Sequence, residues 1–100
     1  MKVQIQYVKM PTNDSLGEMV TQNLNKLAHK FPFVLRADVI FKEENDPSER
    51  GMICEIRLSA PGPRLFAKSD ESSFEKAAME TVSDLERQLK KRKGVLKKHH

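Results

Sequence analysis

The apolar residues of this chain repeat at every second position in four segments and with helical spacing in two others. Val3, Ile5 and Tyr7 alternate with polar residues, which is the pattern of a half-buried strand. The other segments of period two lie at about residues 35–43, 52–60 and 65–69, the last of them short. The chain is therefore limited to folds that combine a four-stranded sheet with two helices.

Two segments carry apolar stripes at spacings of three and four. The first stripe consists of Leu16, Met19, Val20, Leu24, Leu27 and Phe31, and the second of Phe74, Ala78, Val82, Leu85 and Leu89. Asn13 is the expected N-cap of the first helix, and Pro32 is expected to end it at Phe31. The second helix is expected to begin at Ser72, with Glu75 completing a capping box.

The resulting order, β-α-β-β-β-α, predicts an α+β fold in which both helices pack on one face of the four-stranded sheet. A length of 100 residues corresponds to one domain. We expect this domain to span residues 1–93. Gly94 is expected to end or loosen the second helix, which leaves residues 94–100 as a basic, mobile C-terminal tail.

The sequence carries no sign of export or of membrane contact. No run approaches the ~20 apolar residues that a membrane span needs, and the first residues lack a signal-peptide core. Cys54 is the single cysteine, so an internal disulfide is excluded. These features predict a cytoplasmic protein.

Charge is distributed unevenly along the chain. All 14 acidic residues lie at or before Glu86, so residues 1–86 carry a net charge of −3. The last fourteen residues carry +7 and no acid: Arg87, Lys90, Lys91, Arg92, Lys93, Lys97 and Lys98. A neutral-to-acidic body with a concentrated basic end indicates a polyanionic partner.

The basic end has two interpretations. Cations in the last turn of a helix complement its macrodipole, but this effect is confined to about one turn. The cations between Arg87 and Lys98 exceed that need and point in most directions around the helix, which favours a projecting rod that binds phosphates. Lys26 and Lys30 would extend the same surface if the two helices lie side by side. Most aromatic residues are in phase with the core, so recognition of folded RNA by shape is favoured over stacking on single-stranded bases.

Enzymatic chemistry finds no support in the sequence. Cys54 is in phase with the apolar residues of its strand, which favours a buried structural thiol over a nucleophile. His29 lies on a polar flank, while His99 and His100 end the chain, either as native residues or as the remainder of a tag. They form no metal-ligand spacing, and no glycine-rich phosphate loop is present. We therefore expect no catalytic residue, metal, cofactor or small-molecule substrate.

Three segments resemble the bacterial ribosome hibernation-promoting factors, also called ribosome-associated inhibitors. They are Leu-Phe-Ala-Lys at residues 65–68, Phe-Glu-Lys-Ala at 74–77 and Leu-Glu-Arg-Gln-Leu-Lys-Lys-Arg-Lys at 85–93. The last is the most specific, and the similarity covers essentially residues 1–93. The chain departs from many members at residues 73–79, where they carry Asp-Met-Tyr-Ala-Ala-Ile-Asp.

The resemblance implies a fold like that of double-stranded-RNA-binding domains and a translation-silencing role. Family members bind the small ribosomal subunit in the channel for mRNA and tRNA, through basic residues of both helices. By position, this implicates Lys26, Lys30, Arg87, Lys90, Lys91, Arg92 and Lys93 in binding rRNA, with Lys68 as a weaker candidate. The chain resembles the short form, which lacks the C-terminal dimerisation domain, so a monomer is expected off the ribosome.

Two questions stay open at the level of sequence. The basic helix could instead serve a protein-interaction module that regulates a transcription factor. If the chain does silence ribosomes, the sequence also leaves open whether it only inactivates them or also dimerises them with a helper protein.

Overall fold

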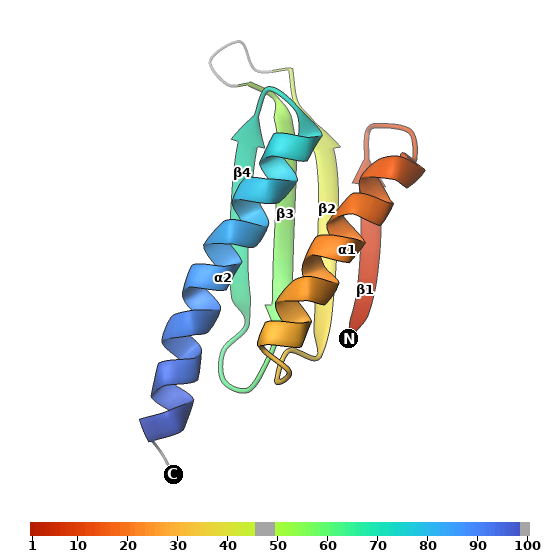
Figure 1. Ribbon diagram of the computed structural model, residues 1–100. Helices are drawn as coiled ribbons and strands as arrows, with labels where there is room; N and C mark the ends of the chain where they lie inside the picture. Colours follow the sequence, from red (N-terminus) through yellow and green to blue (C-terminus); the bar gives the residue numbers. More distant parts are fainter. Residues whose placement is uncertain (46–49, 99–100) are drawn as a thin grey trace.

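The computed structural model describes residues 1–45 and 50–98 and contains the expected elements in the expected order (Figure 1). These are β1 (Lys2–Val8), α1 (Asp14–Lys30), β2 (Arg36–Glu43), β3 (Met52–Ser59), β4 (Leu65–Glu71) and α2 (Phe74–Lys98). The predicted α+β class and the β-α-β-β-β-α order are confirmed. Residues 46–49, in the loop between β2 and β3, and the two terminal histidines lie outside the described residues.

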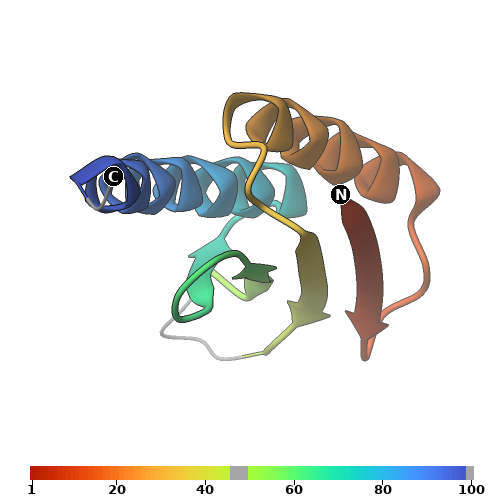
Figure 2. The same ribbon diagram turned by 90° about the horizontal axis from the view of Figure 1, so that it is seen from below.

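The four strands form one sheet in the order β1-β2-β3-β4. β1 and β2 pair in parallel because α1 carries the chain back along the sheet between them, whereas β2, β3 and β4 are joined directly and pair antiparallel. Viewed along the strands, both helices lie on one side of the sheet (Figure 2). No helix of the described residues covers the opposite side of the sheet.

Local hydrogen bonds explain where the helices begin and end. Asn13 Oδ1 accepts from the Leu16 backbone N–H at 3.1 Å, which confirms the predicted N-cap of α1. At the other end of α1 the Phe31 N–H still bonds Leu27 O, and Pro32 prevents a further turn. The cap of α2 is Ser73, whose Oγ accepts from the Lys76 N–H, so the prediction that Ser72 begins the helix was off by one residue.

Gly17 allows α1 to approach β1 closely. The Tyr7 hydroxyl donates to Asn13 O at 2.8 Å, beside the first turn of the helix. A Cβ atom at position 17 would lie 2.9 Å from the Tyr7 hydroxyl oxygen, closer than real side chains come. A glycine that only weakens a helix in isolation thus leaves room for the Tyr7 hydroxyl where the helix meets the sheet.

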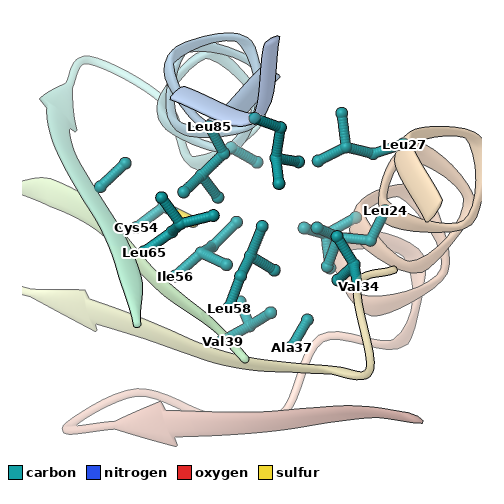
Figure 3. Packing of buried hydrophobic residues seen from close by; sticks show 14 of the residues in the cluster. Leu24, Leu27, Val34, Ala37, Val39, Cys54, Ile56, Leu58, Leu65 and Leu85 are labelled. Carbon is teal, nitrogen blue, oxygen red and sulfur yellow. The ribbon is translucent and has the colours of Figure 1, made fainter. Parts of the chain in front are cut away.

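The core fills the space between the sheet and the two helices. Figure 3 shows Leu24 of α1 and Leu85 of α2 pointing toward Ile56 and Leu58 of β3. At the other end Phe41, which is fully buried, packs against the rings of Tyr7 and Phe74, with centroids 5.8 Å and 5.9 Å away. The aromatic contacts therefore join β1, β2 and α2.

Two elements are longer than predicted. β4 extends to Glu71 instead of ending near Ser69, because its pairing with β3 continues to the register Met52–Glu71. α2 continues through Gly94 to Lys98, so the expectation that Gly94 ends the helix is wrong. A single glycine costs a helix only about 1 kcal/mol, and its neighbours are good helix formers. The mobility of residues 94–100 stays a prediction.

Neither helix of the described residues has a stretch long and apolar enough to cross a membrane.

Candidate nucleic-acid interface

The basic part of α2 runs past the end of the sheet. Leu89 is the last fully buried residue among those of α2 whose burial is described, and beyond it the ribbon continues below the body of the molecule (Figure 1). Lys90, Lys91 and Lys93 lie at this transition with exposed side chains. The predicted projecting rod is therefore anchored through Leu89, and its first cations lie where the helix leaves the body.

Arg92 differs from its cationic neighbours because it contacts the body. Its guanidinium donates to Pro61 O at 2.5 Å and to Pro63 O at 2.9 Å, in the turn between β3 and β4. Gly62 has φ +92° there, and a Cβ atom on it would lie 2.9 Å from the Arg92 Nη1 atom. In the structure the donors of Arg92 hold this turn against α2, and the binding of RNA by Arg92 stays a prediction.

This geometry predicts a stability role for Arg92. Replacing Arg92 with lysine keeps the charge but loses the two-pronged contact, and we expect it to lower the free energy of unfolding by about 1–2 kcal/mol. Urea denaturation measures this loss as a lower midpoint. Lys91→Arg is the control, because Lys91 is exposed and the change should leave the midpoint in place. Equal midpoints for Arg92→Lys and the native chain would contradict the assigned role.

Glu86 joins the two helices. Its carboxylate lies 3.2 Å from Lys30 Nζ of α1 and 3.5 Å from Lys90 Nζ, one turn along α2. The hydrogen bond from Lys30 is the main reason that the pKa of Glu86 is lowered, with Lys90 adding to the effect. Glu86 thus brings Lys30 and Lys90 together and offsets part of their charge.

The two helices also border a shallow groove of about 260 Å³. Lys26 and Lys30 line it from α1, while Met79 and Glu86 line it from α2. Lys93 completes this side of the molecule, with its ammonium 5.9 Å from the centre of the Phe31 ring. The condition set by the sequence, that α1 and α2 lie side by side, is thus met, and Lys26 and Lys30 adjoin the basic end of α2.

Two other predicted residues do not line this groove. Arg87 is exposed, and its guanidinium lies 3.6 Å from Asp84 on the same helix. Lys68 lies on β4, where it alternates with the buried Ala67 and stands opposite Glu55 of β3. Since Ala67 faces the helices, Lys68 faces the uncovered side of the sheet and is separated from the other predicted cations.

The described residues also locate the groups considered for chemistry. Cys54 is fully buried, and burial raises the pKa of its thiol to about 12, against a smaller opposing effect of the hydrogen bond with Thr81. The thiol is therefore protonated at neutral pH. Across residues 1–45 and 50–98, no group of three or more His, Cys, Asp or Glu residues could hold a metal ion.

Removing the carboxylate between the two lysines provides a prediction. Glu86→Gln deletes one negative charge from the basic surface and leaves both lysines available, so we expect RNA affinity to rise by about threefold at low salt. Fluorescence anisotropy with a labelled RNA hairpin measures this change. The matched control is Glu75→Gln, since Glu75 lies in the first turn of α2, far from the basic end. A weaker affinity for Glu86→Gln would mean that the ion pairs are needed to position the lysines.

Comparison with known proteins identifies the family. The model of the family described as sigma 54 modulation protein / S30EA ribosomal protein matches residues 3–97. No curated protein matches the chain. Among solved structures, a ribosomal subunit interface protein from Coxiella burnetii is similar over 94% of this chain and 99% of that chain, with 19% identity and a TM-score of 0.84.

A second solved structure, the Protein Y N-terminal domain of Thermus thermophilus, has 21% identity and a TM-score of 0.72, over 90% of this chain and 93% of that chain. At such identities these two likenesses establish the fold alone. The family match covers nearly the whole chain and agrees with the resemblance seen in its residues. The chain therefore belongs to the family of sigma 54 modulation proteins and S30EA ribosomal proteins.

Proposed function

We propose that this protein is a non-enzymatic hibernation factor that binds rRNA of the small ribosomal subunit and occludes the channel for mRNA and tRNA. The observation that carries the proposal is the group of exposed cations on α1 and on the end of α2. Its members are Lys26, Lys30, Arg87, Lys90, Lys91 and Lys93. Two comparisons support the same partner. The chain belongs to a family that includes S30EA ribosomal proteins, and its fold is similar to that of a solved ribosomal subunit interface protein.

The charges of this surface suit a phosphate-lined site. Two acids form ion pairs with these cations. Glu86 is shared by Lys30 and Lys90, and Asp84 lies beside Arg87. Lys91 and Lys93 take part in none of the ion pairs between described residues. Cations without an internal partner can bind phosphate without first breaking an ion pair, and each contact releases counterions.

Inhibition by this mechanism requires only that the site be filled. The molecule measures 48 × 27 × 18 Å, so a bound copy excludes other ligands from a site of that size. In our proposal the protein acts as a monomer in the cytoplasm and needs no cofactor, membrane or small-molecule substrate. Stress or stationary phase is the expected setting of this activity.

An order-of-addition experiment tests occlusion. The protein is added to small subunits either before or after mRNA and initiator tRNA, and tRNA binding is measured on filters. We expect strong inhibition when the protein is added first and little when the ligands are already bound. Inhibition that is independent of order and is not relieved by excess tRNA would contradict steric occlusion.

The family name supports one alternative. Sigma 54 modulation is the first activity in the family's description, which agrees with the second hypothesis, a module that regulates a transcription factor. That function predicts weak RNA binding with little salt dependence, whereas several phosphate contacts predict a steep one.

A further inference from the structure

The side of the sheet that faces away from the helices carries a second group of cations. At the end of the sheet near the N-terminus, neighbouring strands place Gln4, Asp38, Arg57 and Phe66 opposite one another. Lys2 of β1 stands opposite Arg36 of β2, two positions before the pair of Gln4 and Asp38. These side chains alternate with the buried residues of their strands, so they face the uncovered side.

We define the sheet-face patch as Lys2, Arg36, Arg57, Arg64 and Phe66. Asp38, which faces the same side of the sheet, is bound by Arg36, with Nη2 and Oδ1 2.8 Å apart. Arg57 stands opposite Asp38 in the register, and Arg64 directly precedes the buried Leu65, in phase with the exposed Phe66. The hydrogen bond from Arg36 is the largest cause of the lowered pKa of Asp38, and the charges of Arg64 and Arg57 lower it further. Arg57 and Arg64 take part in none of the ion pairs between described residues.

Phe66 gives this patch an aromatic surface. Its side chain is 45% exposed, unlike that of Phe41, which is fully buried. The guanidinium carbon of Arg57 lies 6.0 Å from the centre of the Phe66 ring. Gln88 of α2 donates to Phe66 O at 3.0 Å, which fixes the strand that carries the ring. Because the strand is held in place, little conformational entropy is lost when a partner stacks on the exposed ring.

The combination of ring and cations selects the kind of partner. An acidic peptide would bind the arginines but would gain little from a flat aromatic surface. A nucleotide uses both, because its base stacks on an aromatic ring or guanidinium plane while its phosphates bind the cations. The patch therefore fits an RNA segment with at least one unpaired base.

We infer that the sheet-face patch is a second RNA contact, in which Phe66 stacks on an unpaired base while Arg57 and Arg64 bind the flanking phosphates. The inference rests on the proposed function and extends it to the opposite side of the molecule. The helices and the patch lie on the two sides of the sheet (Figure 2). The protein would thus be held between two RNA surfaces, one against the helices and one against the sheet.

Substitutions in the patch test this inference in the full chain. Loss of a stacked base by Phe66→Ala is expected to weaken binding to small subunits by about tenfold, whereas Phe66→Tyr keeps a ring and should bind like the native chain. Arg57→Glu is expected to weaken binding by about tenfold as well. Lys76→Glu makes the same charge change at an exposed site at the start of α2 and should have little effect.

The outcomes separate this inference from the proposed function. If Phe66→Ala and Arg57→Glu bind like the native chain while Lys90→Glu/Lys91→Glu does not, the second contact is refuted and the proposed function stands. If the native chain does not bind small subunits, both fail. If Arg57→Glu weakens binding, Phe66→Ala does not, and oligoglutamate displaces the subunit, the patch binds an acidic protein and the RNA assignment is overturned.

Discussion

Replacing Lys90 and Lys91 together with glutamate is expected to weaken binding to the small subunit by about 100-fold, because two attractions to phosphate are lost and two repulsions are added. Both side chains are exposed where α2 leaves the body. Lys90 has one ion pair, with Glu86, and that carboxylate keeps Lys30 as its nearer partner. The substitution should therefore leave the fold intact. Competition binding with labelled native protein measures the loss.

The control for this variant changes the same number of charges elsewhere. Lys9→Glu/Lys76→Glu alters two exposed lysines away from the basic end of α2. We expect it to lower affinity by no more than about threefold, through net charge alone. If both double variants lost affinity equally, binding would depend on overall charge, and the assigned helix surface would be wrong. Arg92 is kept in both variants because it holds the turn at Pro61 and Pro63.

The second large effect concerns stability. Phe41→Ala is expected to lower the free energy of unfolding by about 3–5 kcal/mol, because a fully buried ring is replaced by a cavity. The ring contacts Tyr7 and Phe74, so its loss loosens the packing of β1 and α2 on β2. Urea denaturation should show a lower midpoint with an unchanged slope.

Phe66→Ala provides the matched control for stability, since it is the same substitution on the exposed side of the sheet. We expect its cost to stay below about 1 kcal/mol. This value also makes the binding test of the sheet-face patch meaningful, because a stable Phe66→Ala variant can lose affinity only at the surface. A cost equal to that of Phe41→Ala would mean that Phe66 supports the fold.

Much of the fold follows from local sequence. The alternation of Val3, Ile5 and Tyr7 predicted a half-buried strand, and the structure places these residues against the core. Asn13 and Pro32 marked the ends of α1 because capping and the missing proline N–H act within one turn. The packing of both helices on one face followed from their apolar stripes, which need a shared core.

The features that sequence reasoning missed depend on contacts between distant segments. Gly17 leaves room for the hydroxyl of Tyr7, ten residues earlier, and nothing in the local pattern of α1 indicates this contact. Arg92 resembled its neighbouring cations until the turn at Pro61 and Pro63 was placed beside it. The helical spacing of α2 places Arg92 on the side of the apolar stripe. This was the one signal in the sequence that Arg92 contacts the body.

The candidate site was predicted in outline only. The two sets of basic residues on α1 and α2 adjoin one another as the sequence suggested, but the role of Glu86 between Lys30 and Lys90 needed the helices in place. Sequence reasoning placed most aromatic residues in phase with the core and did not single out Phe66. The register of β4 instead buries Leu65 and Ala67 and turns Phe66 outward, and this is what makes the sheet-face patch visible.

Sedimentation of the purified protein with small ribosomal subunits, repeated over a range of salt concentrations, tests the central claim most directly. We predict saturable pelleting at low salt that falls steeply as salt rises, because several phosphate contacts each release counterions. We also predict that tRNA displaces the protein from the subunits. Absence of pelleting at low salt, or pelleting that neither salt nor tRNA reduces, would contradict binding in the channel through the basic helices.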